Sequence, residues 1–200
     1  MAGPSFSGHC ADAFDYANDI IGGKIDACKH VKNACRRHLN DLKKQKKRAY
    51  PFVFDEKKAE KVCKFIELLP HIKGKWAGKP IKLEPWQKFV LTTVFGWVRK
   101  SDGHRRFREM YLEVPRKNAK STLSAGIGLY MMVADGEAGA EVYSGATTEK
   151  QAWEVFGPAR HMTNKADGFK DFYGLAVGAK NISRLETASK FEPIIGNPGD

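Results

Sequence analysis

The stretch REMYLEVPRKNAKSTLSAGIGLYMMVA, residues 108–134, decides the fold. In its first part, 108–114, apolar residues occupy alternate positions, which is the period of a half-buried β-strand. Its last part, 121–134, is rich in small and apolar residues and predicts a helix. A strand, a loop and a helix in this order open a βα unit. They therefore predict an α/β fold with a parallel sheet.

The loop between strand and helix has the composition of a phosphate-binding loop. Such a loop turns successive backbone N–H groups inward, ends at a helix N-terminus, and carries a Lys that reaches the β- and γ-phosphates of a nucleotide. A hydroxyl directly after that Lys holds Mg²⁺. Lys120 and Ser121 supply these two side chains. The candidate nucleotide-binding residues of the loop are Pro115, Arg116, Lys117, Asn118, Ala119, Lys120, Ser121 and Thr122.

The loop departs from the pattern G-x-x-x-x-G-K-[ST] at both glycines. Val114 stands at the first Gly and Ala119 at the second, and each substitution removes backbone freedom that such a loop uses. The alternative interpretation is therefore an ordinary basic loop between a strand and a helix. The flanking strand and small-residue helix favour nucleotide binding.

The rest of the chain divides into a helical first half and an α/β second half. Apolar residues at steps of three and four predict one helix over 11–48 and a second from Asp55 to Leu69. A third helix begins after Pro85, beyond a Gly- and Pro-rich connector. In the second half, the further elements that we expect are a strand at 140–146, a helix at 149–162 and extended chain at 182–195.

The formal charge of +11 belongs entirely to residues 1–100, because the second hundred residues are balanced. A basic run, KKQKKR (43–48), closes the first predicted helix. This asymmetry suggests a polyanionic partner, and a solubilising helical face is the alternative. The chain has no apolar stretch that could cross a bilayer and no sign of a secretion signal at its start. Its four cysteines show no disulfide or metal-site spacing, so we expect free thiols in a reducing compartment.

Two further features lie in the helical half. Gln87, in the first turn of the helix after Pro85, carries an amide that could pair with the edge of adenine. A solvated helix residue is the alternative. Asp55 and Glu56 follow Phe-Val-Phe, as the acids of a Walker B strand would. Because they open an amphipathic helix beside a Pro, we reject a catalytic role for them.

Together these blocks resemble the N-terminal ATPase region of tailed-phage terminase large subunits. The most specific motifs of the resemblance are PWQ (85–87), VPRKNAKS (114–121) and ATTEKQA (146–152). The similar segments around them cover most of the chain from residue 16 onward. It implies a P-loop NTPase parallel sheet, incomplete here, preceded by an N-terminal helical subdomain. By this analogy residues 1–100 form the basic subdomain with an adenine-binding Gln87, and residues 101–200 form the first part of the ATPase core.

The resemblance also implies roles and partners. Residues 114–122 match a deviant Walker A motif, in which Arg116 joins Lys120 at the phosphates of ATP and Ser121 holds Mg²⁺. The Walker B motif and the nuclease domain would lie beyond Asp200, so we expect this chain alone not to turn over ATP. Arg160 and Arg184 are the candidates for an arginine finger that acts on a neighbouring subunit.

The implied partners are double-stranded DNA, the small terminase subunit, the portal of the procapsid and further copies in a ring, all in the host cytoplasm. Two alternatives use the same residues. One is a non-catalytic DNA-binding module with a decayed phosphate loop, and the other is a helicase-like ATPase unrelated to packaging.

Overall fold

The computed structural model describes residues 6–196, which form two compact units. Residues up to 64 and 83–112 form the first, which we name the helical unit. Residues 65–82 and those from 113 onward form the second, the sheet unit. The stretch 65–82, which belongs to the predicted helical half, is thus part of the sheet unit. Among the described residues, no helix is both long and apolar enough to cross a membrane.

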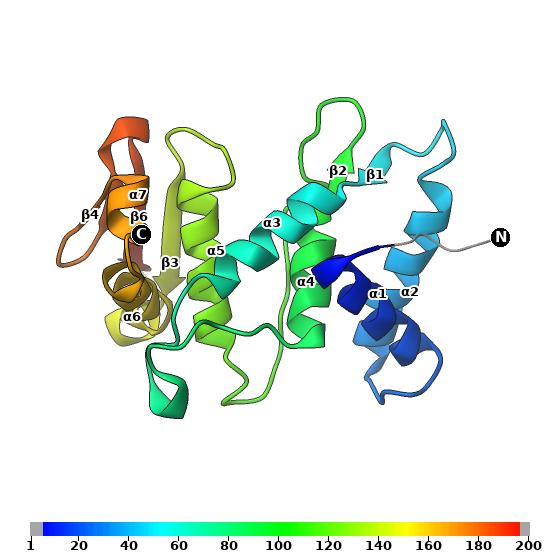
Figure 1. Cartoon of the computed structure of the whole chain (residues 1–200), viewed down its shortest axis with the longest axis horizontal. Coiled ribbons are helices and arrows are strands. Elements are labelled where there is room, and N and C mark those ends of the chain that lie inside the picture. Colours follow the sequence, from blue (N-terminus) through cyan, green and yellow to red (C-terminus); the bar gives the residue numbers. More distant parts are fainter. Residues whose placement is uncertain (1–5, 197–200) are drawn as a thin grey trace. The chain divides into compact units, whose positions relative to one another are not determined.

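Helices make up most of the helical unit (Figure 1), and in its core the rings of Phe54, Phe89 and Trp97 lie edge-on to His38. Its elements are α1 (Gly8–Ile21), α2 (Lys29–Lys44), β1 (Phe52–Phe54), α3 (Glu56–Glu67), α4 (Pro85–Gly96) and β2 (Trp97–Arg99). α1 packs against both α2 and α4, and its buried face includes Ala13, Ala17 and Ile20. β1 and β2 pair antiparallel, with Val53 opposite Val98.

Two polar contacts lie within this core. The Trp97 indole donates a hydrogen bond of 3.0 Å to Nδ1 of His38, a residue that is only 3% exposed. Arg106 forms an ion pair of 2.7 Å with the buried carboxylate of Asp41 and lies over the ring of Phe52. Because a buried polar group is costly without a partner, these contacts fix how α2 packs against its neighbours.

A mixed sheet with helices on one face forms the sheet unit. Its elements are η1 (Gly74–Trp76), α5 (Lys120–Val133), β3 (Glu141–Ala146), α6 (Glu149–Lys165), α7 (Phe169–Tyr173), β4 (Leu175–Val177), β5 (Ile182–Arg184), η2 (Leu185–Thr187) and β6 (Ser189–Ile195). The strand order is β3-β6-β5-β4; β3 and β6 run parallel, whereas the other two pairs are antiparallel.

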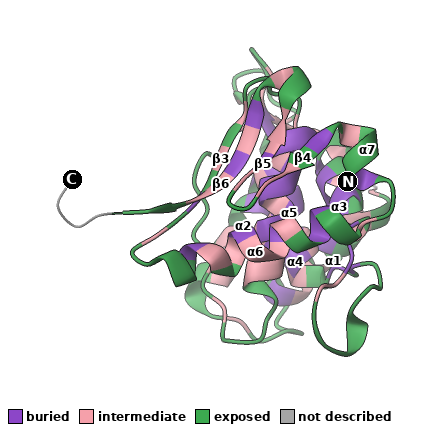
Figure 2. Cartoon of the chain, turned by 90° about the vertical axis from the view of Figure 1, so that its left-hand side faces the viewer, coloured by how far each residue is buried: buried purple, intermediate pink, exposed green. Residues whose placement is uncertain are grey.

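Phe191 on β6 marks the covered face of this sheet. Its ring meets Phe156 of α6 edge-on at 5.6 Å, and a Cβ added to Gly128 of α5 would lie 2.7 Å from it. Both helices therefore cover the same face, whose buried residues are purple in Figure 2. On the opposite face, Lys190 lies 3.6 Å from the exposed Glu141 and 5.3 Å from the ring centre of Tyr143.

Three sequence predictions need correction. The single helix over 11–48 is broken into α1 and α2, because Gly22 caps α1 and Gly23 takes a φ of +78° that a helix cannot continue. The predicted strand at 108–114 is absent: the segment takes no regular secondary structure, and Tyr111 is 90% exposed. The predicted parallel sheet is mixed, because the short β4 and β5 form an antiparallel hairpin that extends onto β6.

Other predictions are confirmed. The helix expected from Asp55 is α3, and Asp55 caps it by accepting a bond of 3.0 Å from the Lys58 N–H. Pro85 is the first residue of α4. The strand at 140–146 and the helix at 149–162 correspond to β3 and α6, and Thr148 caps α6. Cys10, Cys35 and Cys63 are buried free thiols as expected, while the free thiol of Cys28 is exposed.

Candidate functional site

Alternating backbone conformations characterise the loop before α5. Lys117 has a φ of +70° and Ala119 a φ of +53°, whereas Asn118 between them has a negative φ. Ala119 is the N-cap residue of α5, and the helical Lys120 follows it. A backbone that alternates between positive and negative φ can turn successive N–H groups toward one side, as in an anion-binding nest.

The loop is held in this shape from within. The Asn118 side-chain amide donates to the carbonyl oxygens of Pro115 at 3.1 Å and Arg116 at 3.3 Å. The first helical bond of α5 runs from the Leu123 N–H to the Ala119 carbonyl at 2.9 Å. Asn118 thus ties the start of the loop to the turn that enters the helix.

The N-terminus of α5 adds to the positive potential of the loop. The first turn has no side-chain cap and no acidic residue, so the free N–H groups of the helix keep their partial positive charge. Arg116, Lys117 and Lys120 are exposed, and within residues 6–196 their side chains make no ion pair. The loop is therefore an open, unneutralised site that suits an anion.

Ser121 and Thr122 occupy the second and third positions of α5 and are partly buried. A hydroxyl oxygen is a hard ligand of the kind that Mg²⁺ accepts beside phosphate oxygens. Over residues 6–196, no group of three or more His, Cys, Asp or Glu side chains could hold a metal ion.

Gln87 is buried in the first turn of α4, at 6% exposure. Its amide oxygen accepts a hydrogen bond of 2.9 Å from the Glu84 N–H, and the Glu84 carboxylate accepts one from the Gln87 N–H. This reciprocal pair is a capping box. Gln87 is thus not a solvated helix residue. It has a structural task, and its predicted contact with adenine stays a prediction.

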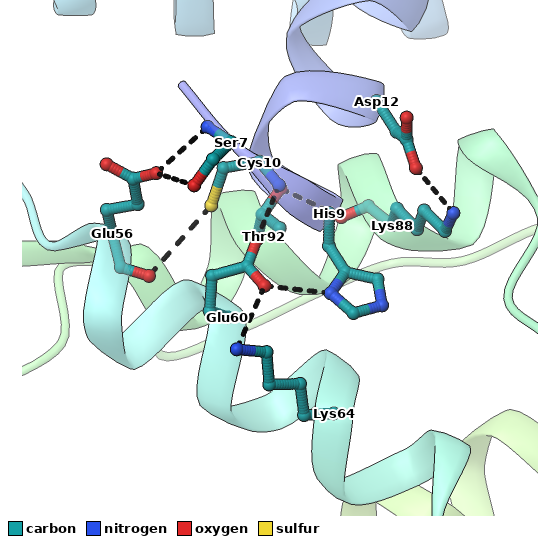
Figure 3. A network of polar contacts seen from close by, with 9 residues as sticks. All are labelled: Ser7, His9, Cys10, Asp12, Glu56, Glu60, Lys64, Lys88 and Thr92. Atoms are coloured by element: carbon teal, nitrogen blue, oxygen red, sulfur yellow. Dashed lines mark hydrogen bonds and ion pairs between the residues drawn. The ribbon is translucent and has the colours of Figure 1, made fainter. Parts of the chain in front are cut away.

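The acids that were rejected as a Walker B pair have structural partners in the helical unit. Asp55 caps α3, and Glu56 accepts bonds from both the N–H and the hydroxyl of Ser7 (Figure 3). One turn further on, Glu60 binds His9 at 2.8 Å and the Cys10 N–H at 2.8 Å. These carboxylates fasten α1 to α3.

The two arginine-finger candidates also have partners. Arg160 donates to the Gly178 carbonyl at 3.0 Å, and Arg184 pairs with Glu186 at 2.9 Å. To act as an arginine finger, each side chain would have to exchange this contact for one on a neighbouring subunit. The arginine-finger role of both residues stays a prediction.

A second candidate site is the exposed face of α2 and the turn after it. This basic face consists of Lys29, Arg36, Arg37, Lys43, Lys44, Lys46, Lys47 and Arg48. In the described part of the chain none of these side chains makes an ion pair. The Lys100 ammonium donates to the carbonyls of Gln45 and Lys47, which holds the turn in place. The face thus presents fixed positive charge to solvent.

The Gly pattern pointed to Val114 and Ala119 as the strained positions; Ala119 has a positive φ, Val114 does not, and the positive φ of Lys117 was missed. The alignment with the Gly pattern pointed to residue 119, whereas a Lys gives no sign that it will adopt a positive φ. Only the backbone geometry shows that two residues of the loop, and not one, are left-handed.

The comparisons with known proteins agree with this geometry. A family model for the ATPase domain of terminase large subunits matches residues 85–190, from the first turn of α4 into β6. The chain belongs to this family.

Two matches, one to a sequence and one to a crystal structure, come from phage HK97. The large terminase subunit of Enterobacteria phage HK97 is 33% identical over 132 residues, which cover 64% of this chain and 25% of that protein. The crystal structure of the HK97 large terminase superposes with a TM-score of 0.57 at 24% identity, over 71% of this chain and 28% of that one. The latter likeness shows the fold alone. The chain spans about a quarter of the length of the curated relative that it matches.

Proposed function

We propose that this chain is the nucleotide-binding part of a P-loop ATPase motor that packages duplex DNA into a phage procapsid. The observation that supports it most is the pair of positive φ values at Lys117 and Ala119, on either side of Asn118 and directly before Lys120 and α5. In the proposal this backbone presents N–H groups to the phosphates. Membership of the terminase ATPase family identifies the nucleotide as ATP and the process as DNA packaging.

In this proposal each group of the loop has a separate task. The N–H groups of the loop and of the first turn of α5 bind the phosphate oxygens. Lys120 and Arg116 would neutralise the triphosphate charge, and Ser121 would hold a Mg²⁺ ion that supplies further positive charge there. The loop binds and orients the triphosphate, because positioning and charge stabilisation are the main contributions of a protein to phosphoryl transfer.

The basic face of α2 is the proposed contact with the DNA backbone. Fixed, unpaired cations bind phosphates without regard to sequence, which a motor that moves along any genome needs. The small terminase subunit, the portal of the procapsid and further copies in a ring are the remaining proposed partners, and the host cytoplasm is the proposed compartment. The cutting of DNA would belong to a nuclease domain of the whole protein.

Calorimetric titration tests the proposal. The chain should bind ATP when Mg²⁺ is present and bind it much more weakly in EDTA. Ser121→Ala should remove most of this Mg²⁺ dependence, whereas Ser124→Ala, one helical turn further on, should retain it. ATP binding that is indifferent to Mg²⁺ in the unchanged chain would contradict the proposed role of Ser121.

A second candidate function is a DNA-binding module without nucleotide binding. Val114 and Ala119 in place of the two glycines, together with the basic face of α2, favour it. Absence of ATP binding combined with salt-dependent DNA binding would establish this second function instead.

A further inference from the structure

A short basic hairpin follows α3 and precedes α4 along the chain. The His71 N–H donates to the Lys79 carbonyl at 2.8 Å, and the Gly78 N–H donates to the His71 carbonyl at 2.8 Å. Pro70 and Pro80 form an antiparallel bridge. We name residues 70–82 the basic hairpin, and it carries η1, drawn in teal in Figure 1.

The hairpin is anchored at its base and open at its tip. Leu69 and Ile81 are buried, at 0% and 5% exposure, and the Ile81 N–H donates to the Leu69 carbonyl at 2.9 Å. At the tip, Gly74 and Gly78 take φ values of +74° and +82° with nothing near the position of a Cβ. The chain therefore folds back around Trp76 through two turns that favour glycine.

Trp76 and the lysines around it are exposed. The indole is 51% exposed, and the ammonium groups of Lys75 and Lys79 each lie 5.2 Å from its ring centroid. Residues 68–83 contain no Asp or Glu. Within the described residues the lysines of the hairpin make no ion pair; they are Lys73, Lys75, Lys79 and Lys82.

We infer that the basic hairpin is a second contact with duplex DNA, in which its lysines neutralise phosphates and Trp76 lies against the sugar backbone. An aromatic face held between cations is a recurrent means of binding nucleic acid. An acidic protein partner suits the hairpin less, because lysine is depleted at protein interfaces and carboxylates are better recognised by the bidentate guanidinium of Arg. The inference rests on the proposed function for the identity of the polyanion.

The fluorescence of Trp76 offers a direct test. Trp97 is buried, and Trp86 and Trp153 are partly buried, so Trp76 is the tryptophan most open to an incoming ligand. The probe is a mixed-sequence duplex of about two helical turns, titrated into the full 200-residue chain at several salt concentrations. We expect the DNA to change the tryptophan emission, and Trp76→Phe to remove most of that change.

Charge variants test the lysines. Replacing Lys75 and Lys79 by Gln should reduce the magnitude of the slope of log K against log salt by roughly 2, because each lysine that neutralises a phosphate adds about 0.9 to that magnitude. The matched variant with Gln at Lys43 and Lys44 should also lower the slope, but it should retain the Trp76 signal. Circular dichroism confirms that each variant is folded.

Three results would overturn the inference: an emission change that survives Trp76→Phe, a salt slope unaltered by the Lys75 and Lys79 changes, or an equal Trp76 response to polyglutamate. Failure of the chain to bind DNA at low salt would overturn it as well. Mg²⁺-ATP binding is measured on the same variants. If Mg²⁺-ATP binding persists but the hairpin variants leave DNA binding unaltered, only the inference fails. If the unchanged chain does not bind Mg²⁺-ATP, the proposed function fails.

Discussion

The side-chain oxygen of Gln87 accepts a hydrogen bond of 2.9 Å from the Glu84 N–H, so the predicted adenine contact is also part of a helix cap. The amide nitrogen can still donate to N7 of a purine, but both adenine and guanine accept there. Preference for adenine would need the second lone pair of the oxygen, to accept from the adenine amino group. Gln87 can serve both tasks only if one oxygen accepts two bonds.

Gln87→Ala should weaken ATP binding more than GTP binding. The loss of an uncompensated polar contact corresponds to roughly 1–3 kcal/mol. The variant should also unfold at a lower temperature, because removal of a cap costs about 1 kcal/mol. Competition binding of the two nucleotides and thermal unfolding measure the two effects.

Gln87→Glu separates the tasks. Glutamate preserves the acceptor of the capping box but removes the amide donor. The ratio of ATP to GTP affinity is the readout, because the added charge affects both nucleotides alike. Glutamate can still accept from the adenine amino group but repels the carbonyl oxygen of guanine, so a ratio that rises together with retained thermal stability supports the adenine contact. A ratio equal to that of the unchanged chain would mean that Gln87 serves the cap alone.

Ala119→Gly should stabilise the chain slightly. A left-handed φ of +53° costs an L-residue about 1–2 kcal/mol, part of which the greater freedom of unfolded Gly offsets. We expect a gain of up to about 1 kcal/mol in urea unfolding, with Mg²⁺-ATP binding at least as tight. Ala188→Gly, at a φ of +52° after η2, should stabilise similarly and leave ATP binding unchanged. Destabilisation by Ala119→Gly would contradict the left-handed conformation.

The basic face of α2 should give DNA binding its salt dependence. Changing Lys43, Lys44, Lys46 and Lys47 to Gln should reduce the magnitude of the slope of log K against log salt by up to about 4, because each neutralised phosphate contributes about 0.9 to it. The charge-matched control carries Gln at Lys150, Lys165, Lys170 and Lys180. Equal changes of the salt slope in the two variants would show that DNA binding depends on net charge alone and not on the basic face of α2.

The helical unit should lose stability between pH 6.5 and pH 4. Burial lowers the pKa of His38 to about 4, an effect that nearby Arg37 adds to and Asp41 opposes. The neutral ring is required because Nδ1 accepts from Trp97. The unfolded state therefore binds the proton first as pH falls, and roughly 3 kcal/mol of stability is lost through this window.

Urea unfolding at several pH values measures this loss. His38→Gln should flatten the dependence, whereas His30→Gln, which removes an exposed histidine from α2, should leave it unchanged. The same pH dependence in His38→Gln and in the unchanged chain would contradict the role of His38.

The sequence predicted those elements whose ends carry their own signals. Asp55, Pro85 and Thr148 begin helices through local capping chemistry, and a single sequence contains that chemistry. The strand predicted at 108–114 failed for the opposite reason, since alternation predicts a strand only where a hydrogen-bonded neighbour exists. β1, β2, β4 and β5 have three residues each, too few for a periodic pattern, so only tertiary pairing reveals them.

The candidate site was predicted in part. The order of residues placed Lys120 and Ser121 at the start of a helix, and the structure has them there. The left-handed Lys117, the role of Asn118 in holding the loop, and the buried cap of Gln87 depend on backbone geometry. A residue pattern does not contain that geometry.

The central claim is that the loop before α5 binds the triphosphate of ATP through Lys120. Calorimetric titration with Mg²⁺-ATP of the unchanged chain, of Lys120→Ala and of Lys165→Ala tests it most directly. Lys165 is an exposed lysine near the end of α6, so its variant removes the same charge from the same unit. We expect binding by the unchanged chain and by Lys165→Ala, and none detectable by Lys120→Ala, since the phosphates lose their main cation. Equal affinity of Lys120→Ala and the unchanged chain would contradict the claim.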